Sequence, residues 1–379
     1  MADALVDAKQ RLARTIDRNS EPVIEPIAAD PWVVSSLLQK SIRRGETEIA
    51  QRAAVTLLKL RGSAIGRRFM VIAFEDIGVA SIDAITTVVA ASSDAALRTV
   101  CGGDLRVAVH LAGLLADAPK DRSADYLVGA KDHPAVADFA QAMANAPAEV
   151  RLCSVRDKSL GLPQRAAAAW FMSGLGLRGE GTRSKADLDL LLASFRELDV
   201  PDDLVVATRI AAARTREPIT LMVPLIWLAV NASKEISVCD CPIPPLVTAG
   251  DVPLYALDEH TRLGREAIWR FARENETVRT CLERFVPASQ RRRAANVAAF
   301  YVDGAPVARR LVWDQSDSLQ AFGIERDLLH AGVTPAEGIG PLLECMRANL
   351  GHLNELRAQI LVRSQAVRAP MPTERTVVP

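Results

Sequence analysis

The chain has 379 residues and carries 46 Lys and Arg side chains against 46 Asp and Glu, so its formal net charge is zero. A dedicated nucleic-acid scaffold usually shows a basic excess, so this balance restricts any nucleic-acid site to a local patch. Hydrophobic residues make up 49% of the chain and charged residues 24%, which is typical of a globular protein and excludes disorder along the whole length.

The apolar residues are chiefly alanine, leucine and valine, because aromatic residues contribute only 4%. Alanine and leucine favour helices, and strands do not alternate with helices along the chain, so we expect an all-α, multi-helix bundle. Six cysteines are too few for a disulfide scaffold. The N-terminus lacks the apolar core of a signal peptide, and no apolar run is long enough to span a membrane. We therefore expect a cytoplasmic protein with no membrane partner.

Residues 1–30 are predicted to form an N-terminal arm that starts as a short amphipathic helix. From Trp32 the apolar residues recur at helical spacing, and Gly45 ends the first helix as its C-cap. Further helices are predicted over residues 47–60 and 63–77, from Ser81 onward, over 104–115, and between Pro134 and Pro147. Residues 31–150 are therefore expected to form a first helical domain.

Residues 151–367 are predicted to form a second helical domain. Its helices are expected over residues 164–175, 185–198, 204–215, 219–232, 258–285, 290–301, 324–331 and 336–367. Residues 236–253, which are rich in proline, are expected to be the longest loop. A short β-hairpin is predicted near residues 300–313, around the turn dipeptide Asp303-Gly304. The tail over residues 368–379 is expected to be disordered.

Several segments of the first domain carry a family resemblance. They read SLLQKSIRRG at residues 36–45, RRFMVIAFEDIGVA at 67–80, LAGLLADAPKDRSADYLVGA at 111–130 and AMANAPAEVRL at 142–152. Residues 31–150 resemble the C-terminal helical region of the RarA/MgsA family of AAA+ proteins, which acts in replication-associated recombination and repair. The family-like motif comprises Arg67, Arg68, Glu75, Asp76 and Gly78.

The resemblance implies a helical scaffold, which in that family serves for oligomerisation beside an ATPase. It does not imply ATP hydrolysis, because the sequence has no G-x-x-x-x-G-K-[ST] motif and the family's ATPase module is not found. The glycine-rich stretch 174–185 has the wrong spacing for a phosphate loop and is interpreted as a linker. Lys120 is followed by Asp121 and Arg122, where the family pattern has Ser-Asn.

We therefore expect a non-catalytic oligomerising scaffold or adaptor in DNA replication, recombination or repair. Its expected partners are further copies of itself, with an ATPase acting in trans and DNA as additional candidates. No cofactor is expected.

Two adjacent carboxylates, Glu75 and Asp76, lie at the end of a predicted helix, where the negative end of the helix dipole disfavours them. Arg67 and Arg68 lie two turns earlier on nearly the same face, and the two arginines that end the first helix are other candidate counter-charges. The sequence leaves two interpretations open. One is a salt-bridged helix junction, and the other is a site that holds a partner or a DNA-facing arginine.

The strongest basic run consists of Arg291, Arg292, Arg293, Arg309 and Arg310. Three aromatic residues, Phe300, Tyr301 and Trp313, lie nearby in the sequence. Basic side chains interleaved with stacking rings suit single-stranded nucleic acid. Direct nucleic-acid binding is therefore the first alternative function, against the simpler interpretation that the charges are a solvated face.

A dense polar cluster consists of Tyr255, Asp258, His260 and Arg262. His260 near carboxylates is a candidate general base, so an enzyme or a small-ligand protein is the further alternative. The competing interpretation is a salt-bridged helix start. Cys239 and Cys241 with one distant histidine fall short of the paired ligands of a structural zinc site, so no metal site is expected.

Overall fold

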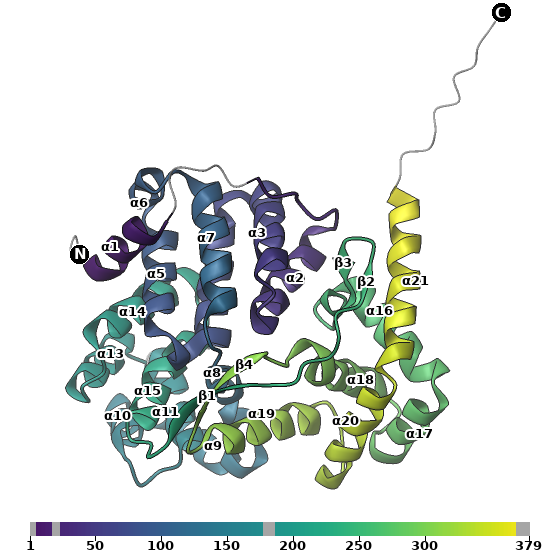
Figure 1. Ribbon diagram of the computed structural model, residues 1–379. Helices are drawn as coiled ribbons and strands as arrows, with labels where there is room; N and C mark the ends of the chain where they lie inside the picture. The colour runs from purple at the N-terminus through teal and green to yellow at the C-terminus, as the bar shows by residue number, and fades with distance from the viewer. Residues whose placement is uncertain (1–4, 17–22, 177–185, 369–379) are drawn as a thin grey trace, which may run out of the picture. The chain divides into compact units, whose positions relative to one another are not determined.

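The computed structural model describes residues 5–16, 23–176 and 186–368, and almost all of its regular structure is helical (Figure 1). Strands occur in two short antiparallel pairs within these residues. The all-α class that alanine and leucine content predicts is confirmed. The chain divides into two compact units: unit 1 comprises Met1–Pro244 and Ala305–His330, and unit 2 comprises Pro245–Gly304 and Ala331–Pro379.

These units differ from the predicted division between residues 150 and 151. Residue 150 lies inside helix α10 (Ala148–Arg156), and the Arg151 side chain is fully buried. Its guanidinium donates hydrogen bonds to the carbonyl oxygens of Met143, at 2.8 Å, and of Phe171, at 3.0 Å. Segments on both sides of the predicted boundary therefore share one core.

The first half of unit 1 contains α1 (Val6–Thr15), α2 (Pro31–Arg44), α3 (Thr47–Arg61), α4 (Ile65–Ile72), α5 (Ile82–Ser93), α6 (Ala95–Val100), α7 (Asp104–Asp117) and α8 (Ser123–Val128). Helices α2, α3 and α7 pack against one another (Figure 1). Local signals set their ends: the Asp30 side chain accepts from the Trp32 amide at 3.0 Å, and Gly45 takes a left-handed conformation after α2.

The predicted amphipathic helix at the N-terminus is α1, which packs against α5. The Arg11 guanidinium donates to the Thr86 hydroxyl at 3.1 Å, and Lys9 forms an ion pair with Asp94 at 3.1 Å. Residues Ala8 and Leu12 face inward and are fully buried. The arm is thus joined to unit 1 by an apolar face and by polar contacts on its flanks.

The second half of unit 1 contains α9 (Ala137–Asn145), α10, α11 (Leu162–Ser173), α13 (Leu188–Glu197), α14 (Asp202–Thr215), α15 (Met222–Val230) and α19 (Ser316–His330). Strand β1 (Ile236–Asp240) pairs antiparallel with β4 (Arg309–Trp313), with Ile236 opposite Trp313. The loop predicted over residues 236–253 therefore begins with a strand. Its partner lies about 70 residues away in sequence, so no local pattern could indicate the pair.

Strand β4 falls inside the predicted hairpin region, but residues 300–304 do not form its partner strand. They continue α18 (Arg291–Ala299) as a π-helical turn, Phe300–Gly304. Asp303, expected in a hairpin turn, is buried and forms an ion pair with Arg357 at 2.5 Å. The Asp-Gly dipeptide therefore ends a helix here and does not form a hairpin turn.

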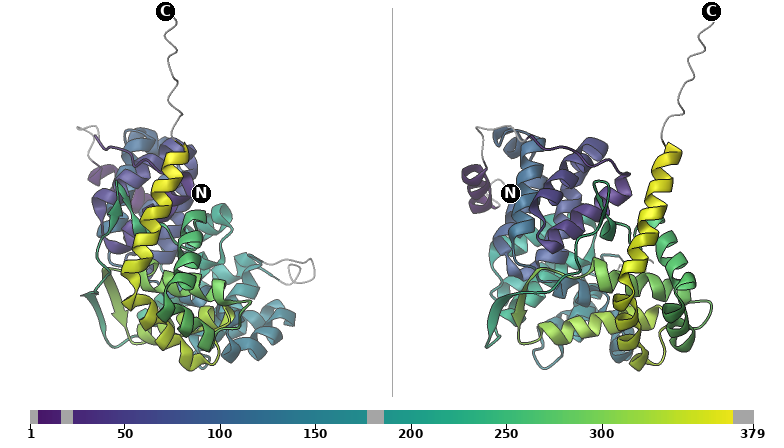
Figure 2. Two further views of the ribbon diagram at one scale, coloured as in Figure 1. Left: turned by 90° about the vertical axis from the view of Figure 1, so that its right-hand side faces the viewer. Right: turned by 45° about the vertical axis from the view of Figure 1, so that its right-hand side comes forward.

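Unit 2 contains α16 (Arg262–Glu274), α17 (Glu276–Phe285), α18, α20 (Ile339–Ala348) and α21 (Leu350–Arg368), with a hairpin of β2 (Thr248–Ala249) and β3 (Val252–Pro253). Helix α16 packs against α18 and α21, the yellow helix of Figure 2. Leu263, Ile268 and Phe271 form the buried face of α16. The opposite face of α16 is polar.

Some predictions fall outside the described residues. These are most of the predicted glycine linker, 174–185, and all but the first residue of the predicted tail, 368–379. Among the described helices, none is both long and apolar enough to cross a membrane.

Candidate functional site

The family-like motif lies where α4 changes its winding. Residues Ala73–Ile77 form a π-helical turn, and Gly78 ends it with a φ of +50°. The turn directs two adjacent carboxylates toward α2. The Gln39 side-chain amide donates to Glu75 Oε1 at 2.8 Å and to Asp76 Oδ2 at 2.7 Å. Turns of this kind are frequent at functional sites.

Two arginines neutralise these carboxylates. Arg43 Nε donates to Asp76 Oδ1 at 2.6 Å, and Arg43 Nη2 donates to Glu75 Oε1 at 2.7 Å. Arg122 Nε donates to the same Asp76 oxygen at 3.1 Å. The Asp76 side chain is 0% exposed and both arginine side chains are 2% exposed. The motif is therefore a buried, salt-bridged helix junction, which is one of the two interpretations that the sequence left open.

The helical spacing of Arg67 and Arg68 misled the prediction of counter-charges. Arg67 instead donates to the main-chain carbonyl of Thr215 in α14, and Arg68 donates to the side-chain oxygen of Gln39. The π-helical turn widens the helix, so the 3.6-residue spacing assumed for that prediction does not hold through Glu75. Arg68 still supports the junction, because it orients the amide that binds both carboxylates.

Arg122 is the member of the junction that sequence reasoning missed. It lies in the loop before α8, at the position where the resembled family pattern has Asn. Besides Asp76, its guanidinium binds Asp125 at 2.5 Å and the carbonyl oxygen of Ala305 at 3.2 Å. Two features of the sequence could have pointed to Arg122. Two adjacent buried carboxylates need a second cation, and an arginine stands here where the family pattern has Asn.

Lys120, two residues before Arg122, is also buried. Its ammonium donates to the carbonyl oxygen of Ala116 at 2.9 Å and to that of Ala118. Its main chain bonds to the two residues of β4 that flank Arg310: the Lys120 amide donates to Arg309 O, and the Leu311 amide donates to Lys120 O, both at 2.9 Å. Burial lowers the pKa of Lys120 to about 8.

The two carboxylates of the junction differ in acidity. Burial raises the pKa of Glu75 to about 7, and the charges of Asp76 and Asp125 act in the same direction. Burial also acts to raise the pKa of Asp76, but the charges of Arg43 and Arg122 outweigh it and lower that pKa. Glu75 is therefore the member that changes its charge near neutral pH.

Gly78 is required at this junction for two reasons. Its φ of +50° and ψ of −141° lie in a region that is essentially restricted to glycine, and an added Cβ would lie 2.5 Å from the Asp121 carbonyl oxygen. Gly62 has nearly the same backbone angles, 58° and −145°, but no atom within 4 Å of its Cβ position.

Gly78→Ala and Gly62→Ala are therefore a matched pair. We expect each to lose about 1–3 kcal/mol of unfolding free energy through backbone strain. Gly78→Ala is expected to lose more, because it adds the clash with Asp121. Urea denaturation followed by circular dichroism measures the difference. Equal losses of unfolding free energy in the two variants would show that the close approach to Asp121 does not affect stability.

A second polar site lies on unit 2, along the outer face of α16. Thr261 caps the helix, its hydroxyl accepting from the Gly264 amide at 3.0 Å. The residues that line a groove of about 620 Å³ there are Arg262, Arg265, Glu266, Trp269, Arg270, Arg273 and Glu274 of α16 and Arg292 of α18. They recur at intervals of three and four residues, which places them on one side of the helix.

The groove holds more positive charge than its own acids neutralise. Arg270 pairs with Glu274 at 2.5 Å, and the Arg265 guanidinium donates to the Glu259 carbonyl at 2.8 Å. Across the described part of the chain, the side chains of the other three groove arginines form no hydrogen bond or ion pair; they are Arg262, Arg273 and Arg292. An adjoining groove brings Arg363 of α21 beside Arg262 and Arg270.

The basic run predicted from the sequence is divided between the units. Arg291, Arg292 and Arg293 begin α18 in unit 2, whereas Arg309 and Arg310 belong to β4 in unit 1. Of the five, Arg292 lines the groove, and Arg310 is paired with Asp317 at 2.7 Å. Arg291 donates to the Val286 carbonyl at 3.2 Å. Arg293 and Arg309 are exposed.

The aromatic residues expected to stack with nucleic acid are buried instead. Phe300, Tyr301 and Trp313 are at most 9% exposed, so they are core residues, which is the simpler interpretation of these rings. The aromatic residue in the groove is Trp269, which sequence reasoning missed. The sequence could have indicated Trp269, because an arginine lies one helical turn before it and another lies one turn after it.

The polar cluster at the start of α16 serves mainly as a local cap. Tyr255 and Asp258 are buried, and Asp258 Oδ1 accepts from the His260 main-chain amide at 3.1 Å. The His260 side chain is 64% exposed, and its ring meets the edge of Phe300. Of the four predicted residues, Arg262 lines the groove, and neither groove on α16 includes the other three.

Cys239 and Cys241 are the two cysteines that were considered as metal ligands. Their sulfur atoms are 4.0 Å apart in unit 1, and His260 belongs to unit 2. Within residues 5–16, 23–176 and 186–368, no three His, Cys, Asp or Glu side chains are grouped to hold a metal ion.

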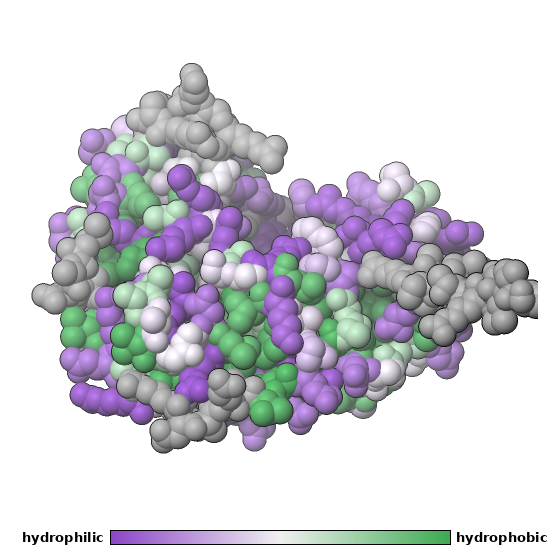
Figure 3. Space-filling model, turned by 90° about the horizontal axis from the view of Figure 1, so that it is seen from above, coloured by the Kyte–Doolittle hydropathy of each residue, from purple (hydrophilic) through white to green (hydrophobic). Residues whose placement is uncertain are grey.

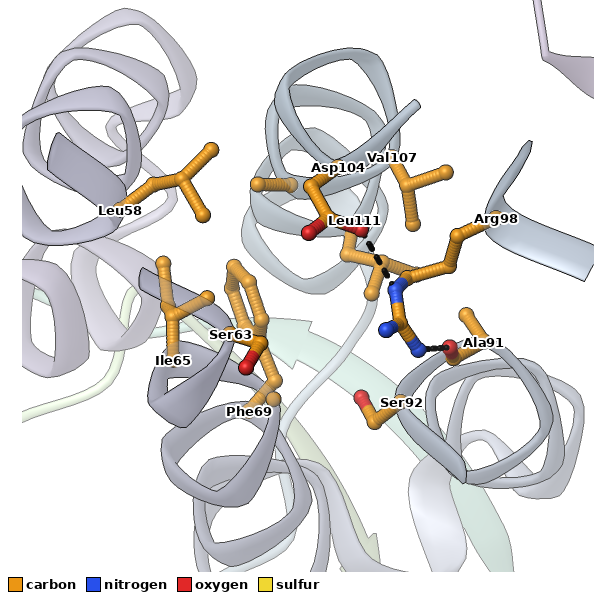
Figure 4. Close-up of a pocket in the computed structure, with 12 residues that line it drawn as sticks. Leu58, Ser63, Ile65, Phe69, Ala91, Ser92, Arg98, Asp104, Val107 and Leu111 are labelled. Carbon is orange, nitrogen blue, oxygen red and sulfur yellow. Dashed lines mark hydrogen bonds and ion pairs between the residues drawn. The ribbon is translucent and has the colours of Figure 1, made fainter. Parts of the chain in front are cut away.

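A small cavity lies in unit 1 among α3, α4, α5 and α7 (Figure 4). Its walls are mostly apolar, and its polar side is Arg98, which binds Asp104 Oδ1 at 2.7 Å and the Ala91 carbonyl at 3.0 Å. Its volume is about 30 Å³, room for about two water molecules. The cavity is therefore a packing feature and not a ligand site.

No protein-family model, curated protein or solved structure matches this chain. The resemblance to the RarA/MgsA family thus remains a likeness of the quoted segments, and function has to be inferred from the two sites described above.

Proposed function

We propose that this chain is a non-catalytic nucleic-acid-binding protein of DNA metabolism, which holds the phosphate backbone in the α16 groove of unit 2. The observation that carries the proposal is the groove itself, with five arginines and two glutamates around one tryptophan. The planar guanidinium group of arginine matches phosphate oxygens with two parallel hydrogen bonds, which makes it the preferred residue for this contact.

Local charge excess supports a polyanion as the ligand. The chain as a whole is neutral, so the three unpaired arginines of the groove concentrate positive charge on one surface. Such a surface attracts nucleic acid at long range and then positions it through phosphate contacts, without reading its sequence. The groove is also open to solvent, as a site for a long ligand must be.

Unit 1 is proposed to be the scaffold part of the molecule. Three of the segments that resemble the RarA/MgsA family meet in the buried junction: Arg43 comes from the first, Glu75 and Asp76 from the second, and Arg122 from the third. This favours an oligomerising scaffold or adaptor in DNA replication, recombination or repair, with an ATPase in trans as a candidate partner and the cytoplasm as its location.

Unit 1 has exposed hydrophobic side chains that could serve in such contacts. Leu60, Val100 and Leu105 are exposed at the ends of α3 and α6 and at the start of α7. Figure 3 shows hydrophobic residues exposed among hydrophilic ones on one face of the molecule. Exposed hydrophobic groups bordered by polar ones are typical of protein contact surfaces.

The groove predicts a charge-dependent affinity for DNA. Fluorescence anisotropy with labelled forked, single-stranded and duplex DNA over a salt series is expected to show binding that weakens steeply with salt. Reversing two unpaired arginines, Arg262→Glu with Arg273→Glu, is expected to lower the affinity at least about tenfold. It should also reduce the salt slope by about one for each lost phosphate contact.

A second double variant serves as the matched control, because it changes the net charge by the same amount at positions outside the groove. Arg279→Glu in α17 with Arg309→Glu in β4 replaces two exposed arginines that line neither α16 groove. We expect this double variant to bind almost as the unaltered protein does. Equal losses in both double variants would assign the effect to net charge alone. Absence of binding at low salt would remove the nucleic-acid proposal and leave the scaffold role to be tested with protein partners.

A further inference from the structure

We propose that Trp269 makes the α16 groove selective for single-stranded nucleic acid, by stacking on a base while the arginines hold the flanking phosphates. The inference rests on the proposed function, which it narrows from nucleic acid in general to a single strand. It assigns a specificity-determining role to one residue of the groove.

The position of Trp269 is the first support. It lines the groove at the middle of the outer face of α16, with Arg265 one turn before it and Arg273 one turn after. Side chains three or four residues apart on a helix lie about 5–6 Å from each other at Cβ. Cations and an aromatic ring thus alternate along the groove, which is the arrangement that single-strand binders use.

The surroundings of the ring are the second support. The core face of α16 is completed by Leu263, Ile268 and Phe271, so Trp269 lies off that face and is partly exposed. In the described part of the chain its side chain makes no hydrogen bond and no stacking contact. A large aromatic side chain that neither fills the core nor has a ring partner is available to a ligand.

Selectivity for a single strand follows from the difference between duplex and single-stranded DNA. In a duplex the base faces are covered by their neighbours, so only the phosphates are within reach of a surface groove. In a single strand an unstacked base can lie on the indole while the phosphates remain with the arginines. The groove volume of about 620 Å³ is within the range that encloses a small ligand, so a nucleotide fits.

Trp269→Ala tests this role through a comparison of two ligands, oligo(dT) and the dT·dA duplex of the same length. We expect the affinity for oligo(dT) to fall about tenfold to hundredfold, and the affinity for the duplex to stay within about twofold. Trp269→Phe, which keeps a stacking ring, is expected to recover most of the loss. Trp32→Ala is the matched control, because Trp32 is an exposed tryptophan of unit 1.

Intrinsic fluorescence gives an independent measurement. The chain has five tryptophans, and we expect oligo(dT) to quench the emission of the unaltered protein and to leave that of Trp269→Phe almost unchanged. An unchanged oligo(dT) affinity in Trp269→Ala would overturn the inference, and so would an equal loss for the single strand and the duplex. Absence of binding to both ligands by the unaltered protein would instead overturn the proposed function itself.

Discussion

Replacing Asp76 with asparagine is expected to lower the free energy of unfolding by about 3–5 kcal/mol. The substitution leaves two guanidinium groups, of Arg43 and Arg122, buried without the carboxylate that both of them bind. Arg43 keeps Glu75 and Arg122 keeps Asp125 as a partner, but both lose the one carboxylate that is fully buried with them. Neither arginine can regain its water in the folded state, so the loss exceeds that of an exposed ion pair. Urea denaturation followed by circular dichroism measures the loss.

An exposed ion pair of unit 1 provides the control for this prediction. Asp189 pairs with Arg209, and their side chains are 76% and 42% exposed. Asp189→Asn removes a carboxylate of the same kind from water-exposed surroundings, and we expect it to cost at most about 1 kcal/mol. If Asp76→Asn cost no more than Asp189→Asn, the buried junction would not hold unit 1 together.

The helices of the first domain could be predicted because their signals act within one turn. Gly45 ends α2, and Ser81 begins α5 by accepting from the Ala84 amide at 3.2 Å. Such caps depend only on neighbouring residues, so the sequence is sufficient to locate them. Strand β1 could not be located in this way, because its partner β4 is far along the chain.

The candidate sites were only partly predictable for the same reason. Arg43 was among the candidate counter-charges, but Arg122 reaches Asp76 through space from a loop 46 residues away. Trp269 has a visible helical relation to Arg265 and Arg273, whereas the approach of Arg292 depends on how α16 and α18 pack. Helical periodicity gives the face of one helix, and it does not give the element that faces it.

Glu75→Gln is expected to have the opposite effect to Asp76→Asn, although the two residues are adjacent. The pKa of Glu75 is raised from 4.5 to about 7, so the folded chain keeps a proton that the unfolded chain releases between these values. The stabilisation that this proton gives is complete below pH 4.5 and is lost as the pH rises to about 7. The whole change is about 3 kcal/mol.

Glutamine carries no titrating proton and resembles the protonated carboxyl group. Glu75→Gln is therefore expected to be about as stable as the unaltered chain in mild acid and about 3 kcal/mol more stable above neutral pH. Urea denaturation of both proteins across this range gives a difference curve, in which the other titrating groups cancel.

Two neighbouring groups titrate outside this range. The lowered pKa of Asp76 makes its protonation affect stability only in stronger acid, and the pKa of Lys120, lowered to about 8, makes its deprotonation affect stability only in alkali. A difference that stays constant from pH 4.5 to 7 would show that Glu75 keeps an ordinary pKa and that the junction holds both acids charged.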